Sequence, residues 1–223
     1  MTDIVVLTLK VGVVATLVSL PIAFALAWAL VRGRFPGKLL LDGLVHLPLV
    51  VPPVVTGWLL LLLFAPAGPA GRLLDAAGVT VMFRWTGAAI AAGVMGLPLM
   101  VRAMRLSLEA VDPRLEEAAA TLGASRARVF RTITLPLSLP GVLAGAVLGF
   151  ARGIGEFGAT ITFVSSVPGE TETLPLAIYA ALQRPGAEAL AWRLAAVSVA
   201  LSLLALLASE LLARRIGTRA HVL

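Results

Sequence analysis

The chain has 223 residues, of which 59% are hydrophobic and only 13% are charged. This composition is too apolar for a soluble domain and is typical of an all-α membrane protein with several spans. The chain has no cysteine, which excludes disulfides, thiolate metal sites and cysteine nucleophiles. The net charge of +6 comes from basic residues beside apolar runs, which indicates membrane orientation rather than nucleic-acid binding.

Five apolar stretches are each about as long as the roughly 20 residues that a membrane-spanning helix needs. They cover residues 5–31, 39–64, 85–104, 140–164 and 190–212, within a transmembrane domain of residues 5–215 that a tail of residues 216–223 follows. The second stretch contains Pro48 and the pair Pro52-Pro53, so we expect a kinked helix. It also carries Asp42, which we expect near the interface, and His46, which we expect to be a hydrogen-bonded structural residue.

A polar, basic segment over residues 112–136 separates the third stretch from the fourth. Asp112 can cap a helix that begins at Pro113, and Gly123 can end this helix in a left-handed turn. Ser125 can then cap a second short helix, and prolines at 136 and 140 are expected to break the chain before the fourth span. The composition alone also fits an ordinary connecting loop.

Basic residues set the orientation of the spans. If residues 112–136 are cytoplasmic, most of the arginines and lysines also lie on the cytoplasmic side, as the positive-inside rule requires. The sequence therefore predicts five spans, with the N-terminus outside and the C-terminus in the cytoplasm.

The fourth stretch carries an arginine and a glutamate among several glycines. Arg152 and Glu156 are four residues apart, so they can pair on one helix, and charges at membrane depth usually face a bundle interior or a wet cavity. With Gly153, Gly155 and Gly158, they are our candidates for a gate along a translocation path. A structural pair that ties two helices together fits equally well.

The polar segment also matches a known pattern. Its residues resemble the signature EAA loop of ABC-importer permeases at Glu117, Ala118, Ala119, Gly123, Ile133, Leu135 and Pro136. The resemblance implies a type I importer permease fold with five transmembrane helices, in which residues 112–136 form a cytoplasmic coupling helix seated on an ATP-binding subunit. It also implies that ATP and Mg²⁺ are bound by that partner, and that this chain itself binds no cofactor.

Three further segments resemble the molybdate-type permeases of this family. They are residues 46–55, 96–116 and 155–175, and the last reads GEFGATITFVSSVPGETETLP. The resemblance implies a multi-pass protein of the bacterial inner membrane that carries molybdate or tungstate. Its implied partners are a second copy of the chain, the ATP-binding subunit and an extracytoplasmic oxyanion-binding protein.

Other readings remain open. Sulfate or thiosulfate is the alternative cargo, since the tetrahedral oxyanion permeases are similar to one another. A gradient-driven secondary transporter would be expected to show internal repeats, and we see none. An enzyme ranks last, because the sequence shows no metal-ligand cluster, no Ser/His arrangement and no nucleotide-binding P-loop.

Overall fold

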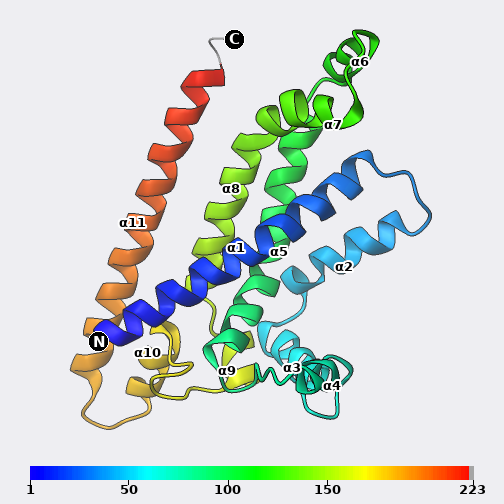
Figure 1. Cartoon of the computed structure of the whole chain (residues 1–223). Coiled ribbons are helices and arrows are strands. Elements are labelled where there is room, and N and C mark those ends of the chain that lie inside the picture. Colours follow the sequence, from blue (N-terminus) through cyan, green and yellow to red (C-terminus); the bar gives the residue numbers. More distant parts are fainter. Residues whose placement is uncertain (221–223) are drawn as a thin grey trace.

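The computed structural model describes residues 1–220, together with the side chains of residues 1–205 and 207. Every regular element in this part of the chain is helical (Figure 1). The helices are α1 (Thr2–Arg32), α2 (Lys38–Val50), α3 (Pro53–Phe64), α4 (Pro69–Ala76), α5 (Trp85–Glu109), α6 (Pro113–Thr121), α7 (Arg126–Val129), the π-helical turn η1 (Phe130–Thr134), α8 (Leu135–Ile154), α9 (Gly158–Val164), α10 (Leu174–Leu182) and α11 (Glu188–Ala220).

Four helices are long and apolar enough to cross a membrane, and the bent pair α2–α3 makes five if it counts as one span. The four are Thr2–Arg32, Trp85–Glu109, Arg126–Ile154 and Glu188–Ala205. Figure 1 shows α6 and α7 at one end of the molecule and α3, α4, α9 and α10 at the other. The N-terminus lies toward the α10 end, whereas α11 runs toward the α6 end. Three residues of the expected tail, 221–223, lie outside the described residues.

The second span is kinked, as the prolines predicted, but more sharply than a single bent helix. Helix α2 ends at Val50, and α3 begins at Pro53 at an angle of 118°. A proline lacks the backbone N–H that continues a helix, so two in succession interrupt the hydrogen-bond ladder. The turn brings α3 against α9, where a Cβ on Gly57 would lie 2.5 Å from the carbonyl oxygen of Ala159.

The predicted bounds of the fourth span, 140–164, are wrong at both ends. The helix runs from Arg126 to Ile154, and Pro136 and Pro140 do not interrupt it. The π turn beside Pro136 accounts for that proline, because the N–H of Leu135 bonds to the carbonyl of Phe130, five residues back. In this wider turn a backbone N–H bonds to the carbonyl five residues back. The bond to the carbonyl four residues back, which a proline removes from an α-helix, is therefore not required there. At the other end, the helix stops before Glu156, and residues 158–164 form the separate helix α9.

The centre of the fold is the contact of α8 with α5 and α1. Every fourth residue of α8 on this face is glycine, at positions 141, 145, 149 and 153, and all four are buried. A Cβ on Gly149 would lie 2.6 Å from the sulfur of Met100, so no larger residue fits without a shift. Gly153 packs between Ala92 of α5 and Gly12 of α1. In a membrane, the hydrophobic effect does not drive helices together, and small residues allow the close backbone packing that holds them instead.

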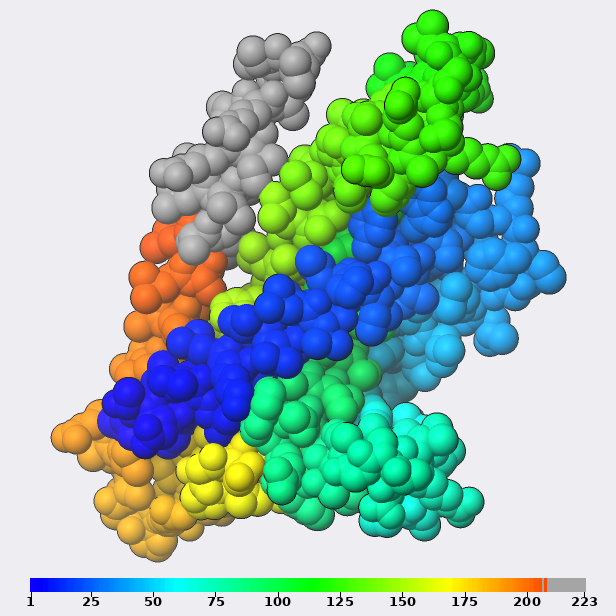
Figure 2. Space-filling view, in the orientation of Figure 1, coloured from blue at the N-terminus to red at the C-terminus, as the bar shows by residue number. Residues whose placement is uncertain are grey.

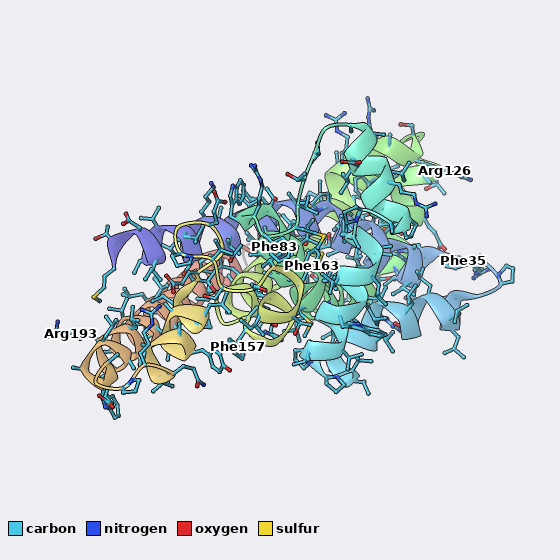
Figure 3. All side chains as sticks on the ribbon, turned by 90° about the horizontal axis from the view of Figure 1, so that it is seen from below. Phe35, Phe83, Arg126, Phe157, Phe163 and Arg193 are labelled. Carbon is cyan, nitrogen blue, oxygen red and sulfur yellow. The ribbon has the colours of Figure 1, made fainter. Side chains whose placement is uncertain are left out.

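A second buried region lies where α3, α5 and α9 meet. Phe163 is fully buried, and its ring centroid lies 5.6 Å from that of Phe64. In Figure 3, Phe163 lies near the middle of the molecule, whereas Arg126 and Arg193 lie toward opposite ends. Helix α11 packs mainly on α10 and α8. Exposed leucines in the described part of α11, such as Leu203 and Leu204, are suited to lipid or to another chain.

Candidate functional site

The two helix caps and the left-handed turn predicted for residues 112–136 are present in the structure. An Asp112 carboxylate oxygen accepts a hydrogen bond from the N–H of Arg114 at 2.9 Å and so caps α6. Gly123 has a φ of +84°, a left-handed conformation that glycine adopts without strain. The hydroxyl of Ser125 accepts from the N–H of Arg128 at 3.4 Å and begins α7. The result, at one tip of the molecule, is the short helix α6 followed by α7, which is the first turn of the long helix over Arg126–Ile154 (Figure 1).

The residues of the EAA pattern fall into two groups. Glu117, Ala118 and Gly123 are exposed on α6 and the turn after it, and Ala119 is half-buried beside them. Leu122, next to this group, has 89% of its surface exposed. The remaining pattern residues, Ile133, Leu135 and Pro136, lie in the π turn and the first turn of α8. The first group therefore forms an open surface, and the second connects that surface to the long helix.

Glu116, which the sequence analysis did not select, holds α6 to the rest of the protein. One carboxylate oxygen accepts from the guanidinium of Arg32 at 3.0 Å and from the hydroxyl of Thr134 at 2.6 Å. Thr134 is buried, with 1% of its surface exposed. Glu116 thus connects α6 to the end of α1 and to η1. No local sequence signal marks this link, because Arg32 lies 84 residues away.

A second ion-pair cluster joins α2 to α5 at the same end of the molecule. An Nη1 atom of Arg105 lies 3.3 Å from both carboxylate oxygens of Asp42, and its Nε donates to Glu109 at 2.8 Å. The Nδ1 of His46 lies 2.9 Å from the backbone oxygen of Asp42. His46 is therefore a hydrogen-bonded residue on its own helix, which agrees with the structural role that the sequence suggested.

Arg152 and Glu156 form the expected ion pair, with 2.5 Å between Nη1 and Oε2. The prediction that they lie on one continuous helix is wrong, because α8 ends at Ile154 and Glu156 lies in the break before α9. The other oxygen of Glu156 accepts from the backbone N–H of Ala159 at 2.7 Å. Only 1% of the Glu156 side chain is exposed, against 28% for Arg152. The glutamate therefore ties the two helix segments together from inside the protein.

The three glycines of the candidate gate have different surroundings. Gly153 belongs to the buried α8 face already described, and Gly158 packs on Pro53, whose Cβ would lie 2.7 Å from an added Cβ. Gly155 is exposed, Arg152 and Gly158 are half-buried, and Gly153 and Glu156 are buried. A gate role for any of the five residues stays a prediction. Among the described residues, no group of three or more histidine, cysteine or acidic side chains could hold a metal ion.

The chain matches a family model described as the inner membrane component of binding-protein-dependent transport systems, over residues 19–218. It is 59% identical to the molybdenum transport system permease protein ModB of Escherichia coli K12 over 211 residues, which is 94% of this chain and 92% of that protein. The ModB of Haemophilus influenzae is 56% identical, over 94% of this chain and 92% of its own length. The sulfate transport system permease CysT of Salmonella typhimurium is 39% identical, over 95% of this chain and 76% of its own length.

Solved structures with the same fold are ABC transporters. A bacterial importer of alginate has a TM-score of 0.75 at 20% identity and covers 96% of this chain and 79% of its own. The inward-facing MetNI methionine transporter has a TM-score of 0.67 at 16% identity, with 96% and 93% covered. Together with the family match, these likenesses show that the chain belongs to the binding-protein-dependent transport system inner membrane components and has the fold of an ABC-importer permease.

Proposed function

We propose that this chain is the permease subunit of an ATP-driven importer for molybdate or tungstate. The observation that carries the proposal is the 59% identity to a molybdenum permease across 94% of the chain. Sulfate is the second candidate cargo, and the lower identity of 39% to a sulfate permease makes it the weaker one. ATP and Mg²⁺ would be bound by a separate subunit.

The exposed surface of α6 supports docking of that ATP-binding subunit. Small side chains at Ala118 and Ala119 leave room for close approach, and the adjacent Leu122 offers an apolar side chain that is 89% exposed. An exposed apolar side chain on a helix of this kind suits docking of the helix into a hydrophobic groove of a partner. Force applied to α6 would reach α1 through Arg32 and η1 through Thr134, since both bond to Glu116.

A path for the anion would lie between two copies of the chain. The buried face of α8 packs against α5 and α1, which favours a path outside this contact. Arg152, with 28% of its side chain exposed, is the charged residue at the α8–α9 break that could meet a passing anion. The extracytoplasmic binding protein would dock at the opposite end from α6, where α3, α4, α9 and α10 gather (Figure 1).

Uptake measurements test this proposal. Cells lacking their own molybdate importer would receive this chain with its ATP-binding and binding-protein partners, and uptake of labelled molybdate would be measured with and without excess sulfate. We expect ATP-dependent uptake that tungstate inhibits and sulfate does not. Uptake that persists without the ATP-binding subunit would favour a secondary transporter, and inhibition by sulfate alone would favour a sulfate permease.

Two variants test the docking surface in the same cells. Gly123→Val would strain a left-handed turn, and Glu117→Lys would reverse a charge on the exposed group. Both should lose uptake and co-purification of the ATP-binding subunit while the chain still inserts in the membrane. Arg193→Ala, on exposed α11, is the matched control and should retain both. Normal uptake with a fully assembled complex in both test variants would refute the docking role.

A further inference from the structure

A narrow apolar groove of about 300 Å³ runs between α1 and α5. Its floor consists of small, buried residues, among them Ala15, Ser19 and Ala89. At Gly93 the helices approach so closely that a Cβ would lie 2.7 Å from the hydroxyl oxygen of Ser19. Larger side chains, spaced by three or four residues, form the two walls: Val14, Val18 and Ile22 on α1, and Ile90, Val94 and Leu97 on α5.

The groove opens to the outside of the described chain rather than into its core. Val18 and Ile22 have 60% and 50% of their surfaces exposed. Both walls belong to helices that are long and apolar enough to cross a membrane. Figure 2 shows α1 running diagonally across the visible face, where it lies in front of the other coloured segments. An apolar ligand could therefore enter from the side.

One end of the groove is polar and positively charged. Trp85 lines this end, and the ammonium nitrogen of Lys10 lies 3.6 Å from the centroid of its ring. The hydroxyl of Thr86, also in the lining, is buried and has no hydrogen-bond partner. Tryptophan and lysine at the end of a span are typical of the boundary between hydrocarbon and headgroups. The charged end of the groove is thus the end that lies at the membrane surface.

The length of the groove fits one hydrocarbon chain. From Trp85 to Leu97 a helix advances by about 18 Å, close to the roughly 15 Å depth of one leaflet of hydrocarbon. A helix with its side chains is roughly 10–12 Å across, so a helix of a second copy would lie over the groove rather than within it.

We propose that the α1–α5 groove binds an acyl chain of an anionic phospholipid, with the lipid phosphate held by Lys10. The lysine ammonium has three donors, and the tryptophan ring beneath it uses none of them in a directed hydrogen bond. The apolar walls take the chain, and the floor of small residues provides the space. This site does not depend on the proposed transport function, since it needs only the membrane around α1 and α5.

Fluorescence quenching tests the site with the full chain in vesicles. The tryptophans at positions 28, 58 and 192 are replaced by phenylalanine, so that Trp85 reports alone. Two sets of phosphatidylcholine vesicles are compared, each with the same small fraction of a lipid that is brominated near the headgroup end of its acyl chain. The brominated lipid is phosphatidylglycerol in one set and phosphatidylcholine in the other. One basic residue near an anionic headgroup should give about a fivefold preference for the brominated phosphatidylglycerol in the quenching of Trp85.

Matched variants separate the phosphate contact from the chain contact. Lys10→Gln should abolish the preference, and Lys10→Arg should keep it. Val94→Phe, which fills the groove from its wall, should reduce quenching by both lipids, whereas Val199→Phe on the exposed side of α11 should change neither. Equal quenching by both lipids in the parent, or an unchanged preference in Lys10→Gln, would overturn the proposal. Protection of Trp85 from both lipids would show that protein covers the groove and would overturn it as well.

Discussion

Because of the ion pair at the α8–α9 break, Arg152→Ala and Glu156→Gln should lower the free energy of unfolding by different amounts. In Arg152→Ala, the carboxylate of Glu156 stays buried with 1% of its side chain exposed and keeps only the N–H of Ala159 as a donor. Removing one partner of a buried pair costs about 3–5 kcal/mol. In Glu156→Gln, the amide oxygen can still accept from Ala159, and Arg152 remains in reach of water. This change should cost only about 1.5–3 kcal/mol, the value of one hydrogen bond to a charged group.

The double variant Arg152→Ala/Glu156→Gln leaves no buried charge without a partner. Its cost should fall below the sum of the single costs by about 0.5–3 kcal/mol, the usual range for interacting residues. Thermal unfolding of the purified chain in detergent measures the change in the free energy of unfolding for the two single variants, the double variant and Arg193→Ala, which is an exposed control. The reasoning fails if Glu156→Gln destabilises the chain as much as Arg152→Ala does, or if the two costs simply add.

Uptake in the same four variants separates a structural tie from an anion contact. If the pair only holds the α8–α9 break, uptake should follow the amount of folded protein in the membrane, and the double variant should transport better than Arg152→Ala. If Arg152 contacts the passing oxyanion, uptake should be lost in every variant that lacks it. Uptake normalised to membrane abundance distinguishes the two results.

Three further predictions concern topology, the link to α6 and helix packing. A reporter fused after Arg215 should be cytoplasmic and one inserted near Glu170 extracytoplasmic; finding both on one side would exclude the five-span arrangement. Exchanging the charges of Arg32 and Glu116 should restore part of the uptake that either single reversal removes, measured at equal ATPase co-purification; no rescue would mean that the pair does not transmit motion. Gly149→Leu should destabilise the chain by about 1–3 kcal/mol through overpacking on α5, and thermal unfolding that is unchanged would contradict the close packing.

Features that depend on neighbouring residues could be predicted from the sequence. The caps at Asp112 and Ser125 and the left-handed Gly123 follow from local backbone chemistry, and the structure has all three. The kink in the second span follows from two adjacent prolines. The bond from Arg32 to Glu116 could not be predicted, because it joins residues that only the folded bundle brings together.

The error in the fourth span has a definite physical cause. Prolines normally end helices, so the sequence placed the start of the span at 140. The π turn next to Pro136 shifts the backbone hydrogen bonds by one residue, so that the N–H of Leu135 bonds to the carbonyl of Phe130. The spacing of apolar residues in the sequence does not reveal this shift. The other end was misplaced because residues 150–163 continue the apolar span apart from Arg152, Glu156 and two threonines. The helix stops in this stretch, and the Glu156 side chain accepts from the backbone N–H of Ala159 at the start of α9.

The π turn also lets the chain carry one extra residue without turning the EAA surface away. Such a turn contains one more residue than an α-helical turn, and both complete about one rotation around the helix axis. Loss of one residue within positions 130–134 would convert the turn to ordinary α-helix and leave α6 and α7 facing nearly the same way around the axis of α8. Within an α-helix, each residue turns the chain by about 100° and advances it by about 1.5 Å, so the same loss in the first turn of α8 would re-aim the docking surface by roughly that angle. A single-codon deletion should therefore be tolerated at the π turn and disruptive a few residues later.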